Sequence, residues 1–117
     1  MFNVLIIHPG ALGDFILSIP AIQALKNRGF FVCVMVREPA FSLSQLFKCI
    51  DKALDLDLIN LWGFNEGFDY IFLIGSSWDK GIINHFRKMG RVYTGPSVKG
   101  GKKWKVLEYL ERFKVLG

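Results

Sequence analysis

Apolar runs the length of a strand alternate with longer stretches of helical periodicity along this 117-residue chain. The runs at 2–8, 30–37 and 69–75 are almost unbroken, which is typical of strands covered on both faces. Residues 58–67 are ambiguous between a loop and a helical turn. Shorter strands are predicted at 52–57 and 91–94, and helices at 14–28, 40–50, 78–88 and 104–114. This repeated order requires right-handed crossovers, so we predict a single α/β domain over residues 1–117, a parallel sheet with helices on both faces.

The first helical stretch has a regular apolar face and one internal proline. Its apolar residues recur at helical spacing, and Gly29 follows as a stop signal. Pro20 lies inside the pattern and predicts a kink or an interruption of the helix. The face predicted to be buried consists of Phe15, Ile16, Ile19, Ala21, Ile22 and Leu25.

Composition excludes several classes of protein. With 51% hydrophobic and 21% charged residues, the chain is too apolar for a disordered segment. No apolar run approaches the roughly 18 residues of a membrane span, and no basic region precedes the first run, so no secretory signal is predicted. Cys33 and Cys49 lack a CxxC spacing and are interpreted as buried small side chains, with no metal site. A reducing cytoplasm is the simplest location.

The turn from the first strand into the first helix is the first place to look for a site, because ligands gather at the carboxyl ends of parallel strands. In His8-Pro9-Gly10-Ala11-Leu12-Gly13-Asp14, two glycines permit a positive φ and a close approach of the backbone to a ligand. The helix N-terminus offers free N–H groups to an anion. The turn is neither the dinucleotide fingerprint, which needs glycine at position 8, nor a P-loop. Asp14 fits two interpretations, a carboxylate favoured by the helix dipole or a general base.

The first third of the chain resembles the opening of glycosyltransferase family 9, the ADP-heptose:lipopolysaccharide heptosyltransferases and their relatives. Residues 4–26 supply the family pattern of an apolar strand, a short turn, Gly-Asp, an apolar triplet and Ser-x-Pro-Ala. The matching positions are Gly13-Asp14, Ser18, Pro20-Ala21 and Leu25. Further along the chain, the similarity is mainly in the order of elements.

The resemblance implies the GT-B architecture, in which two Rossmann-like domains face each other across a cleft. This chain then corresponds to the N-terminal, acceptor-binding domain, and the C-terminal donor-binding domain is absent from it, so the isolated chain is expected to be inactive. The implied reaction moves heptose, or a related sugar, from ADP-heptose to the lipopolysaccharide inner core with inversion. Asp14 is implied to be catalytic, and neither a metal nor a cofactor is implied beyond the sugar nucleotide, which is a substrate.

The same resemblance names candidate residues for binding the acceptor. Gly10, Ala11 and Gly13 line the turn, and His8 stands where relatives have Arg or Lys, although a polar residue at a strand end is the simpler interpretation. Ser76 follows the fourth strand, where it either caps the next helix or contacts the acceptor. For Trp62, Trp78 and Trp104, packing on a helix face is favoured over stacking on a sugar.

Charge is distributed unevenly along the chain. Residues 1–79 carry five Lys and Arg against eight Asp and Glu, whereas residues 80–117 carry ten against two. Such a basic third indicates an anionic partner or, alternatively, a merely solvated surface. We predict that it contacts the acidic acceptor or the inner-membrane surface, which would place the protein in the cytoplasm or peripherally on that membrane. The residues assigned to the acceptor are Arg91, Lys99, Lys102 and Lys103, with Arg87 and Lys88 nearby.

Two other functions fit the pattern. The first is a non-catalytic Rossmann-like module that binds an anionic ligand through its basic C-terminal third. Nucleic acid is not the predicted partner, because only Trp104 borders the basic loop and no RNA-binding signature is present. The second is a receiver-like signalling domain, which needs an acidic pair after the first strand that this chain lacks, although Asp55 and Asp57 follow the third. The face that would meet a second domain is also a candidate surface for a homodimer.

Overall fold

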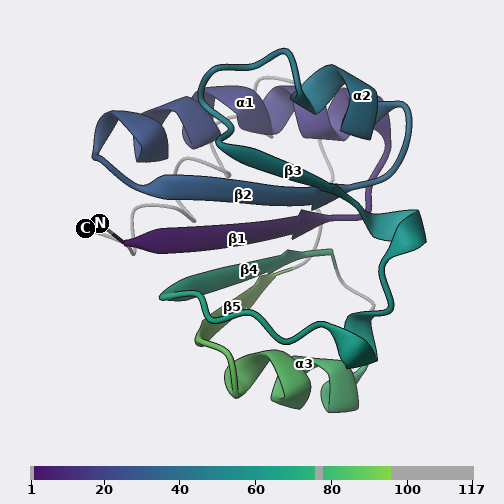
Figure 1. The fold of residues 1–117 in the computed structure, drawn as a ribbon. Coiled ribbons are helices and arrows are strands. Elements are labelled where there is room, and N and C mark those ends of the chain that lie inside the picture. The colour runs from purple at the N-terminus through teal and green to yellow at the C-terminus, as the bar shows by residue number, and fades with distance from the viewer. Residues whose placement is uncertain (1, 76–77, 96–117) are drawn as a thin grey trace.

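The apolar run at the N-terminus forms the central strand of a five-stranded sheet. The computed structural model describes residues 2–75 and 78–95. Within them β1 (Asn3–His8) is flanked by β2 (Phe31–Val36) and β4 (Tyr70–Ile74). β3 (Lys52–Asp55) and β5 (Arg91–Gly95) form the outer strands. Every pairing is parallel and the strand order is β3-β2-β1-β4-β5 (Figure 1), which confirms the predicted fold class.

Helices cover both faces of the sheet. α1 (Leu12–Asn27) and α2 (Ala40–Ser44) lie on one face, and α3 (Lys80–Arg87) lies on the other (Figure 1). Two apolar clusters result, because alternate residues of each central strand point to opposite faces. One cluster joins Phe15, Ile22 and Leu25 of α1 to the sheet, and the other joins Phe86 of α3 to it. None of the helices in the described residues is long and apolar enough to span a membrane.

The helix predicted at 40–50 is shorter than expected. α2 ends at Ser44, and the chain continues through turns in which the N–H of Phe47 bonds to the Ser44 carbonyl and that of Ile50 to the Phe47 carbonyl. Bonds across three residues tighten the backbone relative to an α-helix. The tightening brings Phe47, Cys49 and Ile50 onto the sheet and leaves Leu46 77% exposed.

Of the two effects predicted for Pro20, an interruption of the first helix does not occur. α1 is continuous from Leu12 to Asn27, with Pro20 on its exposed side. A proline deprives the carbonyl four residues earlier of its helical donor, here that of Ile16. Ile16 was predicted to be buried but is 43% exposed, so this carbonyl belongs to a part of the helix that water can reach.

The connection from β3 to β4 contains two short 3₁₀ turns in place of a helix. These are η1 (Leu56–Leu58) and η2 (Leu61–Gly63), so the ambiguous segment does contain a turn that ends at Gly63. Asp55 Oδ1 accepts from the N–H of Asp57 at 3.0 Å, and Asn60 Oδ1 from that of Trp62 at 3.1 Å. The predicted helix at 104–114 lies outside the described residues.

Candidate functional site

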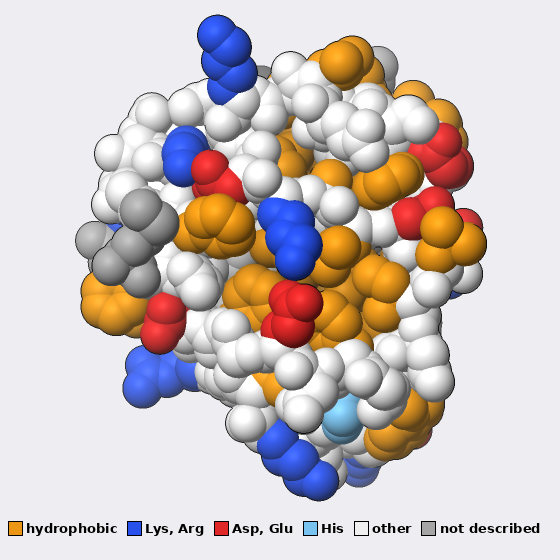
Figure 2. All heavy atoms as spheres, in the orientation of Figure 1, with side chains coloured by type: hydrophobic (Ala, Val, Ile, Leu, Met, Phe, Trp, Pro, Cys, Tyr) orange, Lys and Arg blue, Asp and Glu red, His pale blue; other side chains and the backbone are white. Residues whose placement is uncertain are grey.

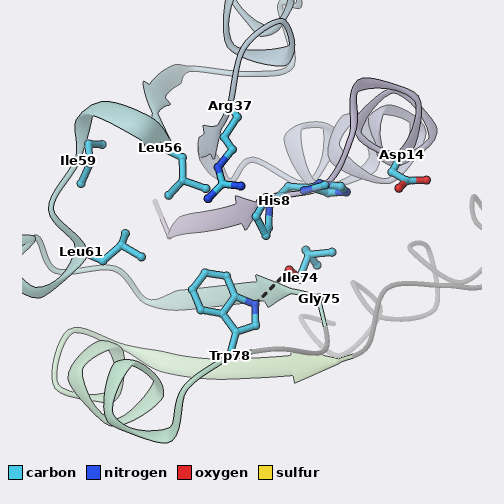
Figure 3. Close-up of a pocket in the computed structure, with 11 residues that line it drawn as sticks. His8, Asp14, Arg37, Leu56, Ile59, Leu61, Ile74, Gly75 and Trp78 are labelled. Carbon is cyan, nitrogen blue, oxygen red and sulfur yellow. Dashed lines mark hydrogen bonds between the residues drawn. The ribbon is translucent and has the colours of Figure 1, made fainter.

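A cavity of about 590 Å³ lies at the carboxyl ends of the first four strands. Its lining residues lie at or just after the ends of β1, β2, β3 and β4. The end of β1 is the place where the sequence predicted a site, in the turn 8–14. Figure 2 shows hydrophobic side chains at the surface in the middle of one face, with acidic and basic side chains beside them. The cavity is lined by His8, Pro9, Gly10, Asp14, Arg37, Leu56, Ile59, Leu61, Ile74, Gly75 and Trp78 (Figure 3).

The cavity coincides with the switch point of the sheet. The chain leaves β1 toward α1 on one face and leaves β4 toward α3 on the other, although the two strands are neighbours. Diverging connections open a crevice at the carboxyl edge of such a sheet, where ligands bind. Gly75 follows β4 with φ +123°, a conformation that other residues rarely adopt, and turns the chain away from the sheet.

His8 and Gly10 form the floor next to β1. The His8 side chain is 2% exposed, and its ring meets that of Phe15 edge-on with centroids 6.1 Å apart. The N–H of Gly10 donates to His8 Nδ1 at 3.3 Å, and a Cβ on Gly10 would lie 2.8 Å from Cε1 of that ring. Gly10 is therefore required by the imidazole packed beneath it, and His8 is a buried residue whose ring borders the cavity.

Asp14 lies at the rim of the cavity. It belongs to the first turn of α1 and is half-buried. Figure 3 shows its side chain on the opposite side of His8 from Arg37, with the carboxylate pointing away from the centre of the cavity. A carboxylate in this position borders the cavity without being sealed inside it.

Arg37 and Trp78 are two cavity residues that the sequence interpretation did not assign to the site. Arg37 directly follows β2, and its Nε lies 3.1 Å from Oδ1 of Asp57, both side chains being more than half exposed. Trp78 precedes α3, and its Nε1 donates to the Ile74 carbonyl at 3.1 Å. The rule that located the turn after β1 applies equally to the end of β2, and it would have found Arg37.

The remaining wall of the cavity is aliphatic. Leu56 belongs to η1, Ile59 follows that turn, and Leu61 begins η2. These residues also pack against the apolar cluster beneath α3. No sequence signal distinguishes them from ordinary core residues, because their place at the cavity depends on how the β3–β4 connection folds.

The other predicted binding residues lie elsewhere. Ala11 and Gly13 are exposed in the turn beside the cavity but do not line it. Arg91 opens β5, opposite Tyr70 at the start of β4, so it lies at the amino edge of the sheet, away from the cavity. Ser76, Lys99, Lys102 and Lys103 lie outside the described residues. Within the described ranges, no three His, Cys, Asp or Glu side chains gather as a metal site would require.

Comparison with solved structures finds glycosyltransferases. The E. coli heptosyltransferase WaaC matches with a TM-score of 0.66 and 10% identity in its structure with ADP-2-deoxy-2-fluoro heptose, and with 0.65 and 14% in its structure with ADP. A glycosyl transferase of family 9 from Veillonella parvula DSM 2008 matches with a TM-score of 0.67 and 11% identity. No protein-family model matches the chain, and no curated protein matches it by sequence.

These matches cover nearly all of this chain but less than half of each neighbour. The shares are 97%, 98% and 99% of this chain against 47%, 47% and 42% of the matched chains. The structural neighbours are therefore a heptosyltransferase and a family 9 glycosyltransferase, the proteins whose opening residues 4–26 resemble. The chain has the Rossmann-like α/β fold that part of a heptosyltransferase and part of a family 9 glycosyltransferase adopt.

Proposed function

We propose that this chain is the acceptor-side part of a glycosyltransferase of the heptosyltransferase type. One observation carries the proposal: Asp14, the residue marked by the Gly-Asp and Pro-Ala pattern, lies at the rim of the cavity at the switch point. The fold shared with two glycosyltransferases supports it. A second, donor-binding domain would face this carboxyl edge, so that acceptor and donor meet at the rim.

The proposed reaction transfers a sugar from a nucleotide to an alcohol. The acceptor hydroxyl gives its proton to the Asp14 carboxylate while its oxygen bonds to the anomeric carbon of the donor. The bond from that carbon to the diphosphate oxygen breaks, the diphosphate leaves with the electron pair, and the configuration inverts. The sugar ring gains positive charge in the transition state, which a nearby carboxylate stabilises. The donor we propose is ADP-heptose, and the acceptor is the lipopolysaccharide inner core.

The experiment is the substitution Asp14→Asn in a two-domain enzyme that contains this chain. We expect kcat to fall about a thousandfold, as loss of a general base does, with the KM for the donor nearly unchanged because the donor is held by the other domain. Asp79→Asn is the matched control, since Asp79 is an exposed aspartate at the start of α3 that makes no side-chain cap bond and does not line the cavity. Full turnover by the Asp14→Asn enzyme would remove Asp14 from the mechanism.

A further inference from the structure

One charged group is turned into the cavity on the side away from Asp14. Among the described residues, the Arg37 guanidinium has one partner, the carboxylate of Asp57, which meets its Nε at 3.1 Å. Figure 3 shows its terminal nitrogens turned toward His8, into the space between Leu56 and Trp78. A guanidinium presents its donors in a planar fork that matches a carboxylate or a phosphate. Arg37 therefore has donors available for an anion inside the cavity.

Apolar side chains line part of the cavity beside Arg37. The indole of Trp78 is fixed by its bond to the Ile74 carbonyl and packs against Gly75, whose missing Cβ would lie 3.6 Å from Nε1. Leu56, Ile59 and Leu61 close the cavity on one side (Figure 3). An aromatic ring beside aliphatic side chains suits the C–H face of a sugar ring.

We propose that Arg37 selects the acceptor by pairing with an anionic group on a sugar whose apolar face packs on Trp78. This inference rests on the proposed function and adds to it the residue that recognises the acceptor. The anion and the attacking hydroxyl would lie at opposite ends of the bound sugar, since Arg37 and Asp14 lie on opposite sides of His8. The basic residues Arg87, Lys88 and Arg91 do not take this role, because α3 ends and β5 begins at the far edge of the sheet.

The test is an NMR titration of the 117-residue chain with four probes. Methyl β-glucuronide carries a carboxylate, glucose 6-phosphate carries a phosphate, methyl β-glucoside is neutral, and inorganic phosphate has no sugar ring. The variant is Arg37→Gln. Arg87→Gln is the matched control, because Arg87 is also exposed and has one side-chain partner, Asn84 Oδ1 at 3.2 Å, but lies on α3 away from the cavity.

We expect one or both acidic sugars to bind about tenfold more tightly than the neutral one, as a charge-assisted hydrogen bond to a partly exposed group allows. The Trp78 indole signal should shift with every sugar. Arg37→Gln should abolish the preference for acid and keep the neutral binding, whereas Arg87→Gln should change neither. Whichever acidic sugar binds more tightly identifies the anion as a carboxylate or a phosphate.

Three results would overturn the inference. A preference for acid that survives Arg37→Gln would show that another group recognises the anion. Inorganic phosphate binding as tightly as glucose 6-phosphate would show a bare anion site without a sugar. Failure of every sugar to bind would also remove the cavity as the acceptor site. The first two results leave the proposed function intact, because the effect of Asp14→Asn on kcat is measured separately.

Discussion

At the scale of single residues, the two glycines Gly10 and Gly13 between β1 and α1 do not have the backbone conformation expected of them. Gly10 and Gly13 were expected to permit a positive φ and a close approach of the backbone to a ligand. Among the described residues only Gly29 and Gly75 have positive φ, and Gly10 is instead required because its Cα lies over the His8 ring. A Cβ on Gly13 would meet nothing within 4 Å, and no packing reason for that glycine is evident. Periodicity and motif spacing locate a turn, but they do not say which neighbour a glycine must clear.

Cys33 provides a residue-scale prediction about pH. Burial raises the pKa of its thiol from the ordinary 9.0 to about 12, an effect that Lys52 partly offsets and Glu66 adds to. The unfolded chain releases this proton near pH 9 and the folded chain keeps it, so the free energy of unfolding should fall as pH rises from about 9 to 12. At pH 10.5 the loss should be about 2 kcal/mol relative to pH 8.

The measurement is urea unfolding at pH 8 and pH 10.5 for the wild type and for Cys33→Ala. The variant should be less stable at pH 8, since the substitution shortens a buried side chain, but its stability should depend less on pH. Cys49→Ala is the comparison: burial also raises the pKa of the Cys49 thiol, so this variant should lose only the part of the pH dependence that Cys49 contributes and keep the part due to Cys33. Equal pH dependence in the wild type and Cys33→Ala would contradict the prediction.

At the scale of elements, strands were predicted better than helices. All five strands were predicted to within a few residues: β-branched and aromatic runs indicate β1, β2 and β4 directly, and alternation of apolar with polar residues indicates β3. α2 was predicted too long because 40–50 keeps an apolar pattern after the helix ends at Ser44. Arg37 was overlooked for another reason: candidate residues were sought after the first and fourth strands, although the same rule covers the carboxyl end of β2.

The connection from α3 to β5 gives an element-scale prediction. A Cβ on Gly90 would lie 1.9 Å from the Phe68 carbonyl oxygen, and that neighbour is backbone that cannot turn aside. The N–H of Phe68 also bonds to the Met89 carbonyl at 3.0 Å, so the two segments cannot separate without losing that bond. Gly90→Ala should therefore lower the free energy of unfolding by about 3 kcal/mol, measured by urea denaturation.

Gly67→Ala is the control for that substitution. A Cβ on Gly67 would meet nothing within 4 Å, and this residue is exposed, has no positive φ and directly precedes Phe68. The free energy of unfolding of the Gly67→Ala protein should be unchanged or slightly increased, because alanine allows the unfolded chain fewer backbone conformations than glycine. A Gly90→Ala protein as stable as the Gly67→Ala protein would mean that the connection rearranges at little cost.

At the scale of the whole molecule, three of the four described cations of the basic third lie at the edge of the sheet opposite the cavity, and the fourth, Lys80, begins α3. Arg87, Lys88 and Arg91 gather where α3 ends and β5 begins, whereas the cavity lies where β1 and β4 end. The five residues of β4, at about 3.3 Å each, separate the two edges. The sequence interpretation assigned Arg91 to the acceptor, with Arg87 and Lys88 nearby, because sequence shows that the three are near one another but not the edge to which they belong.

This separation predicts that surface binding and acceptor binding are independent. Each cation near an anionic membrane contributes about 1 kcal/mol, so replacing Arg87, Lys88 and Arg91 together by Gln should weaken binding to vesicles of anionic phospholipid about a hundredfold at low salt. The same variant should bind methyl β-glucuronide as the wild type does, and Arg37→Gln should show the reverse pattern. Vesicle co-sedimentation over a salt series, paired with the NMR titration, measures both. A parallel loss of the two activities would show that one surface serves both, and vesicle binding that does not depend on salt would show that these cations do not bind the membrane.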